Sequence, residues 1–230
     1  ETTILINNEK GEMLLGKPKG IYITIEGDEL IEGDENIHKI FSKALYENLK
    51  MIIGDSKKIF VVGLGNRHIT PDALGPLVID NLYITRHLIS EKIILESIEV
   101  SALSPGVMAQ TGIETIEILS SLCEKIKPDV VIAIDALAAR EASRLGKTIQ
   151  ICDTGISPGS GVGNNRAKID KNTLGVKVIA IGVPSVISVP AILNQAMENV
   201  VNFFMSKPVV NKIELSDEEK FNLACNFLEE

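Results

Sequence analysis

The chain has 230 residues, and its 45% hydrophobic content is high enough to build a folded core, which excludes a chain that is disordered throughout. Acidic residues outnumber basic ones by 31 to 23, and the net charge of -8 disfavours a general nucleic-acid-binding protein. The three cysteines lack a Cys-x-x-Cys spacing, and no apolar run reaches the roughly 18–20 residues of a membrane span, so we expect a soluble cytoplasmic protein with no membrane partner.

Strands and helices are predicted to alternate along the chain. Residues 1–30 are expected to form an N-terminal β-hairpin extension, because two short apolar runs flank a polar turn. Beyond it, the hydrophobic pattern predicts strands at residues 59–65, 93–100, 129–135, 148–152 and 176–182. It predicts helices at residues 34–53, 72–88, 112–127, 138–145, 190–205 and 216–230. This alternation indicates an α/β fold, a three-layer sandwich with a mostly parallel twisted sheet, in a single domain of residues 1–230.

Polar residues follow three of the predicted strands. Residues 63–72 leave one strand, Asp135 closes a second, and Asp153 follows a third. The carboxyl ends of parallel strands share one edge of a sheet, so we expect all three segments to leave at that edge, and Asp72 and Asp135 to face the same crevice. Two carboxylates that close cannot both ionise easily, so one would keep a proton as an acid while the other acts as a base on water. Asp72 has an alternative interpretation as a helix N-cap after Pro71.

Residues 153–166 form a glycine-rich loop, and such loops are commonly functional. Gly159, Gly161 and Asn164 suggest a phosphate loop, but the Lys-Ser/Thr pair of that motif is missing. We therefore interpret the loop as a wall along an extended peptide. Asp153 begins an Asp-Thr-Gly triplet like that of pepsin-like proteases; because the chain has no second copy, we expect this triplet to shape the loop near the site.

The segment Gly-Leu-Gly-Asn-x-x-x-Thr-Pro-Asp-Ala-Leu-Gly-Pro at residues 63–76 resembles the signature of the germination protease family, the spore endopeptidases of endospore-forming bacteria. Further matching segments follow in the same order at residues 82–88, 101–108, 111–115, 128–140, 149–166 and 181–184. The resemblance extends from residue 20 to residue 190, and motifs this long and ordered are specific.

The resemblance implies a phosphorylase/hydrolase-like α/β fold, shared with the endopeptidases that mature hydrogenases. It implies an endopeptidase that degrades small acid-soluble spore proteins in the spore core during germination, is made as a zymogen and assembles as a homotetramer. The two aspartates proposed as catalytic in the family fall on Asp72 and Asp135. No cofactor, no metal and no nucleic-acid partner are expected.

Around the two aspartates, a set of residues is predicted to contact the substrate, stabilise an oxyanion or support the catalytic pair. They are Gly65, Asn66, Glu114, Asp153, Gly159, Gly161, Asn164 and Arg166. Asn66 and the backbone amides of its turn are the oxyanion candidates. Glu114 also has a purely structural interpretation, because it begins a predicted helix and its charge opposes the helix dipole.

The chain departs from the family pattern in three places. No propeptide is recognisable before Glu1, Ser188 stands where many members have Asp, and the C-terminal segment 206–230 is shorter than usual. The last two departures concern tetramer contacts and C-terminal contributions to the site rather than the core chemistry.

Parts of the sequence also match three other functions. A metal-dependent endopeptidase of the hydrogenase-maturation type would place His68 or His87 with the aspartates, although their separation is not a recognised zinc spacing. A catalytically silent sporulation paralogue would act as a binding module, but we would expect it to lose one of the two aspartates. Peptidyl-tRNA hydrolase shares the Gly-Leu-Gly-Asn turn, but here Arg67 and His68 replace its Pro-Gly, and the acidic charge opposes tRNA binding.

Overall fold

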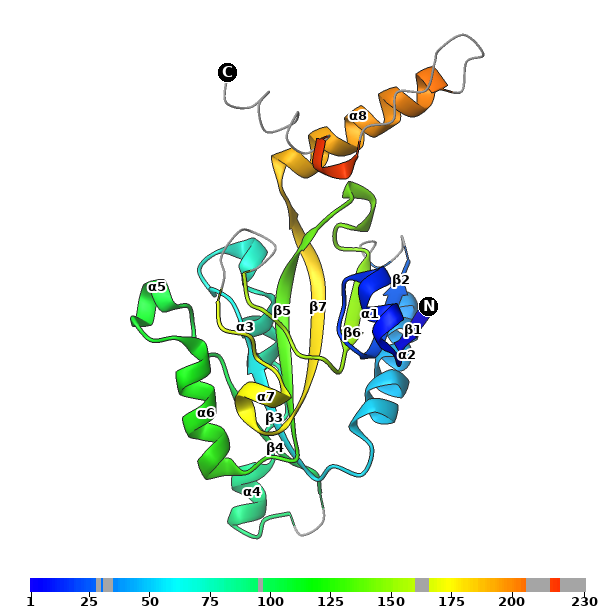
Figure 1. Ribbon diagram of the computed structural model, residues 1–230. Coiled ribbons are helices and arrows are strands. Elements are labelled where there is room, and N and C mark those ends of the chain that lie inside the picture. Colours follow the sequence, from blue (N-terminus) through cyan, green and yellow to red (C-terminus); the bar gives the residue numbers. More distant parts are fainter. Residues whose placement is uncertain (28–29, 31–34, 95–96, 160–165, 206–215, 220–230) are drawn as a thin grey trace.

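The computed structural model describes residues 1–27, 30, 35–94, 97–159, 166–205 and 216–219. Within these residues, a mixed sheet of seven strands has the order β1-β2-β6-β7-β5-β3-β4 (Figure 1). The strands are β1 (Thr2–Ile6), β2 (Gly20–Glu26), β3 (Lys58–Gly63), β4 (Glu99–Leu103), β5 (Val130–Ala139), β6 (Thr148–Cys152) and β7 (Lys177–Ile187). Strands β4, β3, β5 and β7 pair in parallel, whereas β6 is antiparallel to both β7 and β2.

The helices are α1 (Glu9–Leu15), α2 (Glu35–Ile53), α3 (Leu74–Asp80), α4 (Arg86–Ser90), α5 (Met108–Thr111), α6 (Thr115–Ile126), α7 (Lys171–Leu174) and α8 (Val189–Met205), with short 3-10 turns η2 (Thr70–Asp72) and η3 (Ala142–Arg144). Most of the helices connect the strands and cover the faces of the sheet, whereas α8 follows the last strand and projects beyond the sheet (Figure 1). No helix in the described part of the chain is both long and apolar enough to cross a bilayer.

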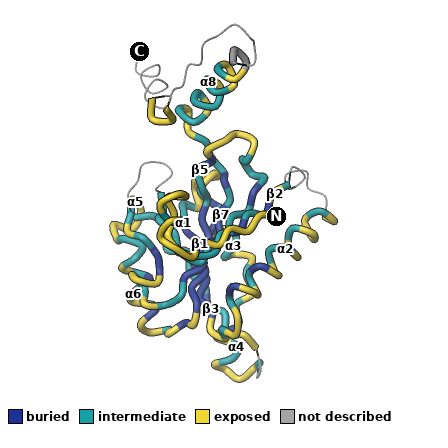
Figure 2. Tube along the Cα trace, turned by 45° about the vertical axis from the view of Figure 1, so that its right-hand side comes forward, coloured by how far each residue is buried: buried dark blue, intermediate teal, exposed yellow. Residues whose placement is uncertain are grey.

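Each face of the sheet has its own hydrophobic core. Strand β3 is apolar at successive positions, so Ile59 and Val61 point to one face while Phe60 and Val62 point to the other. Side chains of α2 and α3 pack on the first face, and those of α6 and α7 pack on the second. Figure 2 shows the buried residues concentrated in the central strands. Burial of each such side chain contributes about 1.5–3 kcal/mol, and the three-layer α/β sandwich is confirmed.

The N-terminal hairpin is confirmed in its strands and differs in its connection. β1 and β2 pair antiparallel, with Leu5 opposite Ile21. The connection is a short helix, α1, and not a simple turn. It begins after Asn8, whose side chain accepts a hydrogen bond from the amide of Gly11 at 2.9 Å. An asparagine cap of this kind is a common helix start.

Two predicted helices are wrong in detail. The helix expected at residues 72–88 is divided, because α3 ends at Asp80 and α4 begins at Arg86. The helix expected at 138–145 does not form: β5 continues to Ala139, and only the turn η3 follows. Main-chain pairing with β7 outweighs the helix propensity of the alanines here, because propensity is a weak preference beside tertiary contacts.

Of three further predicted elements, one is displaced, one is confirmed and one lies mostly outside the described residues. The strand expected at 93–100 forms instead as β4, at 99–103. The helix expected at 190–205 is confirmed as α8. The helix predicted at 216–230 falls mostly outside the described residues. The single-domain assignment, with its 1–30 and 206–230 appendages, stays a prediction.

Strands β5 and β7 extend beyond their neighbours as a two-stranded ribbon that leads to α8 (Figure 1). Their pairing continues as far as Ala139 opposite Ile187. Strand β3 ends at Gly63, which pairs with Ile134. The sequence pattern predicted that Asp135 ends its strand, and this is wrong. Asp135 lies inside β5, next to the turn by which the chain leaves β3.

Candidate active site

The turn after β3 is built from glycines because main-chain segments approach very closely there. A Cβ atom added at Gly63 would lie 2.3 Å from the carbonyl oxygen of Gly75, and one added at Gly65 would lie 2.1 Å from that of Asp72. Gly65 also has a φ of +107°, which side chains disfavour. The amide of Leu64 donates to the carbonyl of Ile134 at 2.8 Å. The turn is thus held between β5 and the start of α3.

Asp72 lies at the end of η2, next to this turn. Its Oδ2 accepts a hydrogen bond from the amide of Asn66 at 2.7 Å. The position before α3 belongs to Ala73, which makes no side-chain capping bond, so the interpretation of Asp72 as the helix N-cap is wrong. The hydroxyl of Ser185 on β7 donates to the carbonyl of Pro71 and fastens η2 to the central ribbon.

Asp135 is 5% exposed and lies on the face of the sheet that α6 covers, because side chains alternate along β5 and Val131 and Ala133 belong to that core. Its Oδ1 accepts a hydrogen bond from the amide of Ala136 at 2.9 Å. Burial is the main cause that raises the pKa of Asp135 to about 7; the negative charge of Asp72 raises this pKa further, against the lowering effect of the Ala136 hydrogen bond.

The carboxyl groups of Asp72 and Asp135 differ in how strongly they bind a proton. Burial also raises the pKa of Asp72 above its usual value, opposed by the hydrogen bond from Asn66. Asp135 is the more buried of the two and its pKa reaches the neutral range. Burial therefore favours the protonated form of Asp135 near neutral pH. Two neighbouring carboxyl groups in different environments can supply one acid and one base.

Asn66 is oriented by a residue that the sequence analysis missed. Its Oδ1 accepts one hydrogen bond from the amide of His68 at 3.0 Å and another from Nε2 of Gln110, on α5, at 2.9 Å. Both bonds engage the oxygen, so Nδ2 remains the group of Asn66 that can donate to a ligand. Gln110 lies between two of the segments that resemble the family, at 101–108 and 111–115, and nothing else in the sequence marks it.

Glu114 and Arg166 also meet near α5. Nη1 of Arg166 lies 3.3 Å from Oε1 of Glu114 and 3.1 Å from Sδ of Met108. Glu114 is the N-cap residue of α6, and its amide donates to Glu117 at 3.0 Å, which supports the structural interpretation of this residue. The ion pair is partly exposed and contributes about 0–1 kcal/mol. Through these contacts Arg166, at the end of the glycine-rich loop, lies against α5, the helix whose Gln110 binds Asn66.

Asp153 lies at the opposite edge of the sheet from Asp72 and Asp135. Strand β6 is antiparallel to β7, so its carboxyl end points toward the opposite edge, and the expectation of a shared edge is wrong for this residue. Oδ1 of Asp153 accepts a hydrogen bond from the amide of Ile21 at 2.7 Å. Strand direction decides this difference, and a single sequence does not reveal it.

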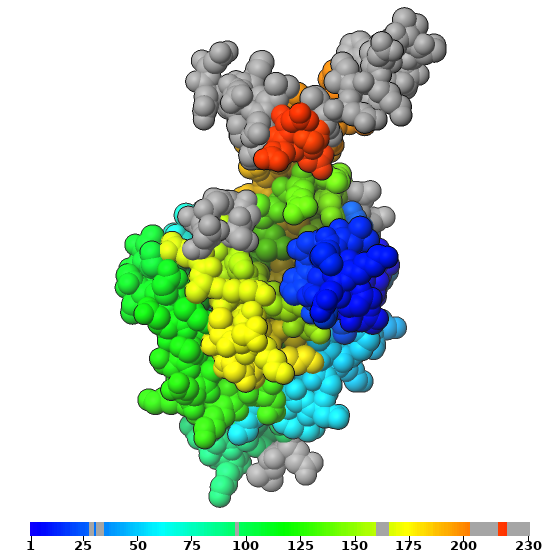
Figure 3. Space-filling view, in the orientation of Figure 1, coloured from blue at the N-terminus to red at the C-terminus, as the bar shows by residue number. Residues whose placement is uncertain are grey.

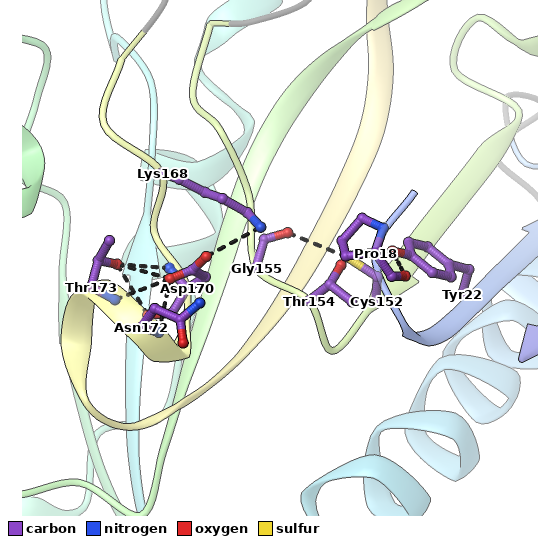
Figure 4. Close-up of polar contacts among 9 residues, drawn as sticks. All are labelled: Pro18, Tyr22, Cys152, Thr154, Gly155, Lys168, Asp170, Asn172 and Thr173. Atoms are coloured by element: carbon purple, nitrogen blue, oxygen red, sulfur yellow. Dashed lines mark hydrogen bonds and ion pairs between the residues drawn. The ribbon is translucent and has the colours of Figure 1, made fainter. Parts of the chain in front are cut away.

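The glycine-rich loop is anchored on both sides. Ile156 and Ile169 exchange two main-chain hydrogen bonds, at 2.9 and 2.8 Å. Asp170 caps α7 and contacts Lys168 (Figure 4). Gly159 adopts a φ of +72°. The predicted site residues Gly161 and Asn164 lie outside the described residues.

The metal-dependent alternative needs a cluster of ligands. Among the residues that the structure describes, no group of three or more His, Cys, Asp or Glu side chains could hold a metal ion. His68 and His87 are both exposed and belong to different elements, the turn after β3 and helix α4.

Comparison with known proteins gives one consistent result. The family model described as germination protease matches residues 2–220. Germination proteases of Caldanaerobacter subterraneus, Clostridium perfringens and Bacillus subtilis are 49%, 45% and 46% identical to this chain over 87%, 92% and 85% of its length. The chain spans 63%, 66% and 55% of the length of these relatives.

A solved structure of a [NiFe] hydrogenase maturation protease from Thermococcus kodakarensis is 19% identical, with a TM-score of 0.40, and the match covers 79% of this chain and 97% of that one. The family model covers nearly the whole chain, and the Gly-Leu-Gly-Asn turn and both aspartates lie inside the matched region. The chain belongs to the germination protease family.

Proposed function

We propose that this chain is an endopeptidase in which Asp72 and Asp135 form an acid–base pair that acts on water. The observation that carries the proposal is the burial of Asp135 beside a second carboxylate, with a pKa raised to about 7. A carboxyl group that stays protonated near neutral pH is available as a general acid. Asp72, the less buried of the two, is available as the base.

In this mechanism, Asp72 takes a proton from a water molecule whose oxygen forms a bond to the scissile carbonyl carbon. Negative charge that develops on the carbonyl oxygen is stabilised by Nδ2 of Asn66, which the contacts of its oxygen leave free to donate. Asp135 then gives its proton to the leaving nitrogen as the carbon–nitrogen bond breaks. Loss of the proton from Asp72 to solvent and uptake of one by Asp135 restore the starting state.

The substrates that we propose are small acid-soluble spore proteins, cleaved in the spore core during germination. Membership of the germination protease family supports the link to germination. We also propose synthesis as a zymogen and assembly as a homotetramer, on the basis of the family resemblance. These proposals concern the whole protein, and the chain spans 63% and 66% of the length of the first two relatives described above.

The test is digestion of a purified small acid-soluble spore protein, followed by mass spectrometry of the products. We expect internal cleavage at a small number of sites by the parent protein and none by Asp135→Asn. If the parent protein leaves the substrate intact, the chain is not an endopeptidase for this class, and a binding role takes its place.

A further inference from the structure

Strand β7 lies in the interior of the sheet, yet Pro184 interrupts its hydrogen bonding. Proline has no main-chain N–H to donate, and within a sheet it is confined to edges, strand starts and bulges. On β5, Leu137 is opposite Pro184. The next residue of β5, Ala138, is opposite Val186, so the register shifts here. Ser185 is therefore the extra residue of a β-bulge, with no paired residue on β5.

A contact from a third segment holds this bulge. The amide of Gly146, between β5 and β6, donates a hydrogen bond to the carbonyl of Pro184 at 2.7 Å. In Figure 3, the segment between β5 and β6 (light green) lies at the upper end of the sheet, above the N-terminal segment (blue). Bulges re-aim a side chain, and they are frequent beside active sites. The direction of the Ser185 side chain is therefore set by main-chain contacts of β7.

The hydroxyl of Ser185 contacts the turn that carries the proposed base. It donates a hydrogen bond to the carbonyl of Pro71, and Asp72 follows Pro71 directly at the end of η2. The turn η2 also lies against both β5 and β7. Gly182, on the same strand as Ser185, is paired with Asp135. A short length of β7 thus connects the segment that carries Asp72 to the residue opposite Asp135.

Two contacts hold Asp72 in different ways. The amide of Asn66 binds the carboxylate itself, whereas Ser185 binds the main chain next to it. Asn66 therefore orients the side chain, and Ser185 determines where η2 lies. The second contact opposes a real force, because two carboxylates repel each other and a half-buried carboxylate gains hydration when it moves outward.

We propose that Ser185 is a positioning residue that holds η2 against β7 and so keeps Asp72 close to Asp135. Its hydroxyl acts through the main chain of η2 and takes no part in proton transfer. The inference rests on the proposed function for its effect on cleavage. The closeness of the two carboxyl groups can be measured without any cleavage, because the charge of Asp72 acts on the proton of Asp135.

The test is an NMR titration of carbon-13-labelled aspartate carboxyl groups, with Asp72→Asn and Asp135→Asn to assign the two signals. In Ser185→Ala, we expect the pKa of Asp135 to fall by about 0.5, the change for a charge that moves outward by about 2 Å. Ser185→Thr keeps the hydroxyl and should titrate like the parent. Ser90→Ala is the matched control, because it removes a serine hydroxyl that donates to a main-chain carbonyl elsewhere, that of Arg86 in α4.

Spore-protein cleavage gives the second readout. Ser185→Ala should lower kcat by about 10- to 100-fold with KM within about twofold, since a misplacement of about 1 Å has this order of effect. Ser185→Thr should restore kcat to within about threefold of the parent, and Ser90→Ala should not change it.

The titration and the cleavage assay separate the two proposals. An unchanged pKa of Asp135 in Ser185→Ala would overturn the role of Ser185, whatever the cleavage rates. An equal fall of this pKa in Ser185→Thr would also overturn it, because the hydroxyl would then not be the cause. If the parent does not cleave while the titrations differ as expected, Ser185 still holds Asp72 beside Asp135, and the proposed function alone is wrong.

Discussion

Asp135 keeps its proton because its carboxyl group is buried in the sheet while a second carboxylate lies nearby. The pKa of about 7 follows from burial first and from the charge of Asp72 second. Asparagine has the same shape but cannot release or accept the proton. We expect Asp135→Asn to lower kcat/KM for spore-protein cleavage by at least about 100-fold, the lower range for loss of an acid–base group.

The matched control for this substitution is Asp55→Asn, which makes the same chemical change at an exposed position before β3. It should leave the cleavage rate within about twofold of the parent rate. Retention of more than a tenth of the parent activity by Asp135→Asn would remove Asp135 from the mechanism.

The same carboxyl group predicts a change in stability with pH. Its pKa is about 7 in the folded protein and 3.8 as its usual value, so the folded state binds this proton more tightly than the unfolded state. Its contribution to folding stability is fully present below about pH 4 and is lost as the pH rises through about 7. At about 1.4 kcal/mol per pKa unit, the free energy of unfolding should fall by on the order of 4 kcal/mol.

In Asp135→Asn, the free energy of unfolding should lack this part of the decrease with pH. Chemical denaturation of the parent and of Asp135→Asn at pH 4.5 and pH 8 measures the difference, with Asp55→Asn as the reference for a surface change. An identical pH dependence in the parent and in Asp135→Asn would mean that Asp135 is ionised normally in the folded protein.

Gln110 is expected to act through Asn66 rather than on the substrate. It donates to Oδ1 of Asn66 and so directs Nδ2 away from α5. Gln110→Glu replaces this donor with a carboxylate, which only accepts hydrogen bonds, and should lower kcat about 10-fold with KM unchanged. Asn66→Ala should lower kcat by about 100- to 1,000-fold. Steady-state kinetics separate the two quantities, and a rise in KM alone for Gln110→Glu would place this residue in substrate binding instead.

At the residue scale, the apolar runs before Asp72 and Asp135 were sufficient to predict that the two carboxyl groups lie near each other, although Asp135 lies inside β5 and not at its end. Their catalytic role stays a prediction. The sequence was not sufficient for Gln110, whose partner Asn66 is 44 residues away. It placed Asp153 at the wrong edge, because the direction of β6 depends on pairing with β7 and not on the residues of β6 themselves.

Among the elements, the contact between the β3 turn and α3 determines where Asp72 lies. A Cβ added at Gly75 would lie 2.3 Å from the oxygen and 2.5 Å from the nitrogen of Leu64. Main-chain atoms cannot yield as a flexible side chain does, so the turn must move. We expect Gly75→Ala to destabilise the protein by about 1–3 kcal/mol and to reduce cleavage, because η2 moves with the turn.

Gly11 of α1 supplies the control, since it is also helical and its added Cβ would meet only side-chain atoms, at 3.2 and 3.6 Å. Thermal unfolding and the cleavage assay should show little change for Gly11→Ala. Equal effects of the two substitutions would argue that the contact between Gly75 and Leu64 does not hold the site.

Elements with long patterns were predicted well, and short ones were not. Buried strands such as β3 and β7 are continuous apolar runs, and α2 and α6 each carry an apolar stripe. Helix α1 depends on a single cap at Asn8, and the alanine-rich end of β5 is a strand only because β7 pairs with it. Helix α1 and the end of β5 depend on local capping and on tertiary pairing, and hydrophobic periodicity predicts neither of these.

For the molecule as a whole, the sheet order brings β3, β5 and β7 together at the centre, so the site combines a turn, a strand interior and a ribbon. The proposed reaction uses two carboxyl groups, water and the side-chain amide of Asn66, and no metal ion. We therefore expect that treatment with EDTA, followed by dialysis, leaves the cleavage rate within about twofold. Loss of activity that one added divalent metal restores would assign the two aspartates to a metal site with His68 or His87.

The central claim is that Asp72 and Asp135 share one catalytic proton, and kcat/KM measured against pH tests it most directly. The parent should give a bell, rising as Asp72 ionises and falling near pH 7 as Asp135 loses its proton. In Asp72→Asn the activity should fall by at least about 100-fold. The remaining descending limb should move to lower pH, because removal of the Asp72 charge lowers the pKa of Asp135. Substantial activity of Asp72→Asn with the parent's profile would contradict the shared proton.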